Sequence, residues 1–124
     1  MTHHFKEHET ACNCGCGENN MSELTLSMFD TARELAGVSF VVTSACRCEY
    51  HNKEVGGVHS SSHLSGLEYS IECEAMDVQA KDSTTRFKIV RALILVGFTR
   101  IGIGKTFIHA DNDKSKSQEV MWLY

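Results

Sequence analysis

The chain contains no proline in its 124 residues, and it also lacks internal repeats and low-complexity linkers. No boundary between domains is therefore marked, and we expect a single domain over residues 1–124. A chain of this length can bury about two-thirds of the surface of its unfolded state without help from disulfides or bound metal.

Positive charge is also scarce. The sequence has 12 Lys and Arg against 16 Asp and Glu, which gives a formal net charge of -4, and its basic residues are scattered. A protein that binds nucleic acid normally presents a basic face to the phosphates. We therefore expect no nucleic-acid partner.

Long apolar runs are missing as well. The longest, ALILVGF, is far too short to cross a bilayer, and the opening MTHHFKEHET lacks the apolar core of a signal peptide. We expect a monomer that has no membrane partner and is made in the cytoplasm without a signal peptide.

Cysteine, in contrast, is abundant. Six cysteines occur as CNCGC (Cys12, Cys14, Cys16), CRC (Cys46, Cys48) and the separate Cys73. In a reducing cytoplasm, clustered thiols are more often metal ligands or free cysteines than disulfides. Their C-x-C spacing differs from the C-x(2-4)-C that zinc ribbons and fingers prefer. Three states stay open: a metal site, a disulfide between the two groups, and unpaired thiols.

Apolar residues at helical spacing predict two main helices. The first spans residues 22–36 and stops at Gly37, and the second begins at Asp82 or Ser83 and is closed by Gly97. The residues expected to form their apolar faces are Leu24, Met28, Ala32 and Leu35 in the first helix and Phe87, Val90, Leu93 and Ile94 in the second. Residues 1–20, which are polar and without periodicity, predict an irregular, Cys-rich arm.

Short apolar segments predict the strands. They are SFVVTS (39–44), AMDVQA (75–80), FTRIGIG (98–104), TFIHAD (106–111) and EVMWLY (119–124), with a hairpin turn at Gly104-Lys105. Residues 45–74 predict loops with one helical turn around Asn52. Helices and strands do not alternate as in a doubly wound fold. We therefore predict an α+β fold in which two main helices cover one face of a small, largely antiparallel sheet.

Asp77 interrupts the apolar strand of residues 75–80. A buried carboxylate is costly without a cation or donor as partner. His63 and His109 also fall on the strands or at their edges, and two imidazoles with one carboxylate suit a catalytic zinc with an open fourth position. Taken singly, these residues are equally compatible with a loop histidine, a capping or solvent-facing aspartate, and a hydrogen-bonded strand histidine.

A series of short motifs changes that balance. The segment VTSACRCEYHNKEVGGVHSSSHLSG is followed by AMDV and then by FIHAD. This order resembles the LAS group of bacterial cell-wall zinc peptidases, which includes D-Ala-D-Ala carboxypeptidases, VanX-type dipeptidases and phage L-alanyl-D-glutamate endopeptidases, with the hedgehog domain as a relative. The likeness is closest to the compact phage and bacterial members. Because HFKEHETACNCGCGEN also resembles their N-terminal arm, it covers nearly the whole chain.

The resemblance implies a hedgehog/D-Ala-D-Ala-peptidase-like fold and zinc-dependent cleavage of peptidoglycan stem peptides. The enzyme would be a carboxypeptidase or an L-Ala-D-Glu endopeptidase, in a phage lysis protein or a bacterial homologue that acts at the cell wall or periplasm. Two other functions stay open. One is a hedgehog-like zinc-binding module without hydrolytic activity, and the other is an interaction domain whose zinc is held by cysteines.

The same resemblance assigns roles to individual residues. It makes His63, Asp77 and His109 the zinc ligands. Arg47 would orient the substrate by meeting a carboxylate or a polarised carbonyl, with Ser61 as a hydrogen-bonding neighbour. A surface ion pair is the alternative for Arg47. His59 could line the cleft or simply be exposed.

The spacing between two of the expected ligands departs from the family pattern. Fourteen positions separate His63 from Asp77, where the family has H-x-x-G-x-A-x-D. We therefore expect residues 67–74 to form an excursion beside the cleft that contributes to substrate choice instead of to the core. Such an insertion costs little conformational entropy, because loop closure depends only logarithmically on length.

The expected general base also departs from the pattern. Thr106 and Phe107 stand where relatives carry an acid or a histidine, and neither can take a proton from water. Asp111 lies two residues after His109 and thus on the same strand face. We predict that Asp111 handles the proton or holds the reactive water. The alternative is that it only orients an imidazole ligand or Arg47.

Overall fold

A computed structural model describes residues 4–58, 61–66 and 71–124 of the chain. His59 and residues 67–70, the first half of the expected excursion, lie outside the described residues. In chain order, the elements are α1 (Glu7–Thr10), α2 (Glu23–Ala36), β1 (Val42–Ser44), α3 (Glu49–Glu54), β2 (Ala75–Gln79), α4 (Ser83–Leu95), β3 (Arg100–Ile103), β4 (Phe107–Asp111) and β5 (Val120–Leu123). This composition confirms the predicted α+β class.

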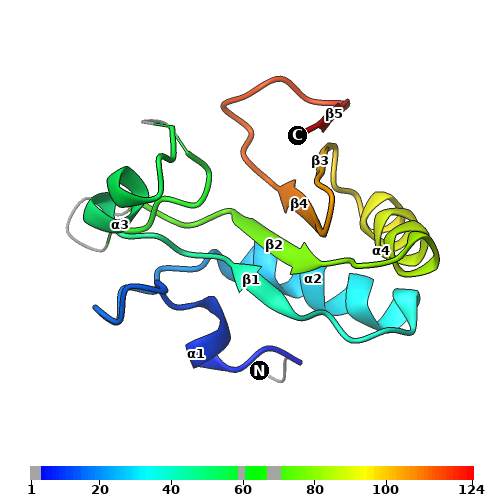
Figure 1. Cartoon of the computed structure of the whole chain (residues 1–124), viewed down its shortest axis with the longest axis horizontal. Helices are drawn as coiled ribbons and strands as arrows, with labels where there is room; N and C mark the ends of the chain where they lie inside the picture. The colour runs from blue at the N-terminus through cyan, green and yellow to red at the C-terminus, as the bar shows by residue number, and fades with distance from the viewer. Residues whose placement is uncertain (1–3, 59–60, 67–70) are drawn as a thin grey trace.

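The strands form one sheet in the order β1-β2-β4-β3-β5 (Figure 1). The pairs β1–β2, β2–β4 and β3–β4 are antiparallel, and only β5 runs parallel to its neighbour, β3. At the predicted hairpin between β3 and β4, the Gly104 N–H donates to the Phe107 carbonyl. The sheet is therefore largely antiparallel, as the sequence predicts.

The two main helices, α2 and α4, pack together on one side of the sheet (Figure 1). The Ser22 hydroxyl caps α2 by accepting the Thr25 N–H at 3.3 Å, and the Asp82 carboxylate caps α4 by accepting the Thr85 N–H at 2.8 Å. Gly37, at φ 69°, ends α2 in the left-handed conformation. Among the described residues, no helix combines the length and the apolar character needed to cross a membrane.

The buried faces of these helices match the predicted apolar faces only in part, because Ala32 and Leu93 are buried and Met28 and Val90 pack partly buried against the core. Leu24 and Leu35 of α2 and Phe87 and Ile94 of α4 are exposed. The buried residues are Thr25, Phe29, Ala32 and Ala36 in α2 and Ile89, Ala92 and Leu93 in α4. The prediction is therefore wrong for Leu24, Leu35, Phe87 and Ile94.

Strands β2 and β4 alternate between the core and the opposite face of the sheet. The residues of these two strands that belong to the core between the sheet and the helices, none of them measurably exposed, are Met76, Val78, Ile108 and Ala110. Asp77 and His109 are register partners, and each lies between two core residues of its strand. Strand alternation therefore places both on the face that the helices leave uncovered.

The N-terminal arm is more ordered than predicted. It contains the helical turn α1, and Phe5, Thr10 and Cys12 are buried. The Phe5 and Phe40 ring centres are 6.5 Å apart, and the Cys46 N–H donates to the Thr10 carbonyl. The expectation of an irregular arm is thus wrong in part, because these apolar side chains anchor it to the domain beside β1 (Figure 1).

The expected excursion is shorter than residues 67–74. Gly66 and Ile71 exchange two backbone hydrogen bonds, of 2.9 and 2.8 Å, so the chain is paired again by Ile71. Cys73 is fully buried, and its N–H donates to the Asn20 carbonyl. The prediction that the whole segment avoids the core is wrong for Cys73, whereas Ile71 and Glu72 are exposed.

Candidate metal centre

The three expected ligand side chains meet on the uncovered face of the sheet. His63 Nε2 lies 3.3 Å from both His109 Nδ1 and Asp77 Oδ1, and His109 Nδ1 lies 2.9 Å from Asp77 Oδ1. Zinc bonds of about 2.0–2.2 Å to nitrogen and oxygen give tetrahedral edges of roughly 3.3–3.5 Å. The three donor atoms are thus spaced nearly as one zinc ion requires.

The second nitrogen of each imidazole has its own acceptor. His63 Nδ1 donates to the Ala45 carbonyl at 2.5 Å, and His109 Nε2 donates to Asp111 Oδ2 at 2.7 Å. A neutral imidazole has only one N–H. The lone pairs of His63 Nε2 and His109 Nδ1 therefore face each other and Asp77 Oδ1 with no donor between them. Three converging acceptors repel one another unless a cation lies among them, so these residues fit a metal ion.

The electrostatics of the site also favour positive charge. Burial would raise the pKa of Asp77, but the neighbouring His109 and His63 outweigh it and hold that pKa well below its ordinary value. Burial would lower the pKa of His109, but the neighbouring Asp111 and Asp77 carboxylates outweigh it and raise that pKa. The two carboxylates thus make the centre a place where a cation is stabilised.

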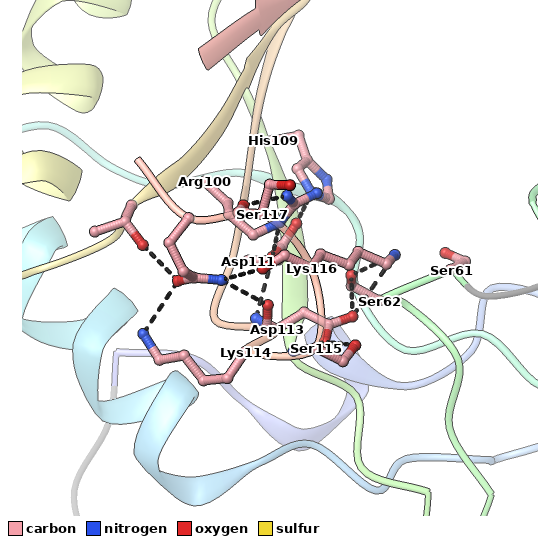
Figure 2. Close-up of polar contacts among 12 residues, drawn as sticks. Ser61, Ser62, Arg100, His109, Asp111, Asp113, Lys114, Ser115, Lys116 and Ser117 are labelled. Carbon is pink, nitrogen blue, oxygen red and sulfur yellow. Dashed lines mark hydrogen bonds and ion pairs between the residues drawn. The ribbon is translucent and has the colours of Figure 1, made fainter. Parts of the chain in front are cut away.

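Asp111 bonds Nε2 of His109 (Figure 2), which is not the ring nitrogen that lies beside Asp77. It is 1% exposed, and its Oδ1 accepts from Arg100 Nε at 2.8 Å and from the Asp113 N–H at 3.1 Å. Burial would raise the pKa of Asp111, but His109 and Arg100 are among the contacts that hold it below its ordinary value. With both oxygens engaged, the geometry favours the role of orienting His109 over the proton-handling role.

Arg47 lines the same cavity of about 420 Å³ as the three donors. Its Nη2 donates to Ser61 Oγ at 3.4 Å, and its Nε is buried with no hydrogen-bond partner in the described parts of the chain. Burial lowers the pKa of Arg47, against the opposing effect of Asp77. A half-buried guanidinium with a spare donor is suited to bind a carboxylate or carbonyl of a ligand.

A glycine determines where the Arg47 side chain lies. A Cβ at Gly57 would be 2.9 Å from Arg47 Nη1 and 2.1 Å from Asn52 Oδ1. Asn52 is itself buried, and its Nδ2 donates to the Val58 carbonyl at 2.9 Å. Asn52 and the V-G-G motif of residues 55–57 thus form a turn beside which the Arg47 side chain lies.

Sequence reasoning missed the aromatic side of the cavity. Trp122 and Tyr124 line it, and the Trp122 and His109 ring centres are 5.6 Å apart. A Cβ at Gly102 would be 2.7 Å from Trp122 Nε1, so this close approach requires glycine. The feature that places Trp122 beside His109 is the strand register, in which Gly102 pairs with both residues. That register depends on the parallel placement of β5.

A second cavity, of about 380 Å³, shares Ser61 and Ser62 with the first. Its other lining residues are Leu64, Ile71, Glu72, Glu74 and Asp113. Ser62 Oγ donates to Asp113 Oδ2 at 2.8 Å and accepts from Lys116 Nζ at 3.0 Å (Figure 2). The described end of the excursion therefore lies beside the metal centre.

The family model of peptidase M15 matches residues 3–111. The match covers the arm, Arg47, Ser61 and the three donor residues, whereas Trp122 and Tyr124 follow it. Comparisons with curated proteins and with solved structures gave no match.

Proposed function

The chain belongs to the peptidase M15 family of metallopeptidases, and from this premise we propose that it is a zinc peptidase that cleaves peptidoglycan stem peptides. The observation that carries the proposal is the convergence of His63 Nε2, Asp77 Oδ1 and His109 Nδ1 in one cavity with Arg47. The resemblance to compact phage and bacterial enzymes supports a phage lysis enzyme, or a bacterial homologue, that acts at the cell wall.

The chain contributes a set of donors whose directions are fixed before a substrate arrives. A zinc ion held by His63, Asp77 and His109 would polarise the scissile carbonyl and lower the pKa of water to about 7. The Ala45 carbonyl and the Asp111 carboxylate each hold one imidazole in the required tautomer. Little reorganisation is then needed when the site is loaded.

Arg47 and Ser61 bind and orient the peptide. Arg47 lines the cavity that contains the donor atoms, and its buried Nε has no hydrogen-bond partner among the described residues. A free C-terminal carboxylate can accept two parallel hydrogen bonds from a guanidinium, whereas an internal carbonyl offers a single oxygen. The same residue therefore serves a carboxypeptidase through a bidentate pair and an endopeptidase through a weaker contact.

Asp111 acts as a positioning residue. Its bond to His109 Nε2 keeps His109 Nδ1 directed at Asp77, and its bond to Arg100 keeps the carboxylate in place. Arg100 also lies over the Trp122 ring at 5.0 Å, so the aromatic wall of the cavity is joined to the same contacts. Loss of the Asp111 charge would disturb both the metal ligand and this wall.

Digestion of purified peptidoglycan by the zinc-loaded protein, followed by mass analysis of the fragments, tests the proposal. Loss of a single alanine identifies a carboxypeptidase, and release of stem peptides identifies an endopeptidase. His109→Ala is the matched inactive control. A folded, zinc-loaded protein that cleaves no wall peptide would overturn the proposal and favour the hedgehog-like binding module.

A further inference from the structure

Four cysteine thiols form a second cluster outside the centre described above. Cys12, Cys14 and Cys16 come from the arm, and Cys48 comes from the N-terminal end of α3. The sulfur of Cys12 lies 3.5 Å from that of Cys14 and 3.8 Å from that of Cys48, and the Cys14 and Cys48 sulfurs are 3.8 Å apart. All four lie within 4.8 Å of one another. Zinc–sulfur bonds of about 2.3 Å give tetrahedral edges of roughly 3.8 Å.

The local backbone explains how cysteines only two residues apart can converge. Gly15 and Gly17 have φ of 89° and 84°, and the Gly15 N–H donates to the Cys12 carbonyl at 3.3 Å. In an extended strand, residues two apart also share a face but lie about 6.6 Å apart along the chain, so the turn is what brings their sulfur atoms closer. A Cβ at either glycine would meet nothing within 4 Å, so the glycines serve the backbone conformation and not a packing need.

Backbone donors point at the sulfur atoms of this cluster. The Cys48 N–H donates to Cys12 Sγ at 3.4 Å, the His51 N–H to Cys48 Sγ at 3.3 Å, and the Glu18 N–H to Cys16 Sγ at 3.4 Å. Hydrogen bonds to the charged form of a group favour that form, and ligating atoms are commonly held by such outer contacts. These donors hold the sulfur atoms in place on the side of the cluster that faces the backbone.

We propose that Cys12, Cys14, Cys16 and Cys48 hold a structural zinc ion that is separate from the His63–Asp77–His109 centre. Four protein ligands close the coordination shell and leave no position for a substrate. Binding replaces the thiol protons, which are released to water. In the structure no disulfide joins any of the six cysteines, all of which lie in described segments.

The position of Cys48 indicates that this second ion also fixes the chain segment that carries Arg47. Cys48 follows Arg47 directly, and the Arg47 N–H donates to the carbonyl of His63 at 2.7 Å. A metal that joins the arm to Cys48 therefore also holds the chain that carries the substrate-orienting arginine. This consequence rests on the proposed function, whereas the metal site itself does not.

Metal content separates the two sites. We expect two zinc ions per chain in protein purified under anaerobic conditions, one in Cys48→Ala, one in His109→Ala and none in the double variant. Cys73→Ala, which removes a cysteine outside the cluster, is the matched control and should keep both ions. Because these counts need no activity assay, the site can stand even where wall digestion fails.

Cobalt substitution identifies the ligands independently. A thiolate-to-cobalt charge-transfer band should appear in the wild-type protein and in His109→Ala but be absent from Cys48→Ala. If Cys48→Ala does not fold, alkylation of the wild-type protein decides, because zinc should protect the four thiols and a chelator should expose them. A single zinc that survives the loss of Cys48, bound iron in place of zinc, or a disulfide within the cluster would overturn the proposal.

Discussion

Asp111 accepts a hydrogen bond from Nε2 of His109 at 2.7 Å, while Nδ1 of the same ring lies 2.9 Å from Asp77. One imidazole is thus held between two carboxylates, each of which contacts a different nitrogen. The carboxylate that lies outside the donor set can set the ligand's direction without touching the reacting atoms. Asp111 is therefore the residue at which positioning and proton transfer can be told apart.

We expect Asp111→Asn to weaken zinc binding by about 10–100-fold, because outer contacts of this kind have that effect on metal affinity. Activity on the wall substrate should fall at limiting zinc and recover most of its value at saturating zinc. The measurements are zinc titration and turnover at both concentrations. A loss of roughly two to four orders of magnitude in turnover with zinc fully bound would instead make Asp111 the general base.

Replacement of His63, Asp77 or His109 by Ala should remove one zinc ion per chain and lower the melting temperature. Binding to the native state alone stabilises a protein by mass action, by about 2.7 kcal/mol at 100 times the dissociation constant. Metal analysis and thermal unfolding with and without added zinc measure both effects. Ser61→Ala, which removes no donor atom, is the control. Full zinc content in all three variants would contradict the ligand assignment.

Gly57→Ala should impair substrate binding while sparing the metal. The added Cβ would lie 2.9 Å from Arg47 Nη1, so the guanidinium must move within the cavity. We expect a several-fold higher KM with zinc content unchanged, measured by kinetics on wall peptides. Gly66→Ala is the matched control, since its Cβ would come no closer than 3.8 Å to Ile71. An unchanged KM in Gly57→Ala would argue against substrate orientation by Arg47.

The parts of the fold that depend on local chemistry could be predicted from the sequence. Ser22, Gly37 and Asp82 limit the helices as their capping roles require, and Asp77 marks the site because a carboxylate is costly within an apolar strand. The buried helix faces could not be predicted in this way. Leu24 and Phe87 are the stronger apolar signals, but both are exposed, whereas Ala32 and Ala92 are buried.

The cysteine cluster shows a second limit of sequence reasoning. The C-x-C spacing of neighbouring cysteines argues against a zinc site, yet Cys12 and Cys16 together have the C-x(3)-C spacing of known sites. The fourth thiol comes from Cys48, far along the chain, and is brought there by the packing of the arm beside β1. Trp122 was missed for the same reason, because its place beside His109 depends on the pairing of β5 with β3.

The excursion provides the last test. Residues 67–70 lie between Gly66 and Ile71, which are joined by two backbone hydrogen bonds, so a two-residue Asn-Gly turn can replace them and keep that pair. We expect this shortened protein to fold, to keep both zinc ions and to change its preference among wall peptides.

Replacement of all of 67–74 should instead destabilise the domain. Cys73 is fully buried, and the backbone of Glu74 bonds the Ser62 carbonyl and the Asn112 N–H, each of which costs about 1–3 kcal/mol when left buried and unpaired. Thermal unfolding, metal content and fragment analysis of digested peptidoglycan compare the two variants. If replacement of residues 67–70 leaves the peptidoglycan fragments unchanged, these residues do not contribute to substrate choice. If the protein stays stable after replacement of residues 67–74, Cys73 is dispensable to the core.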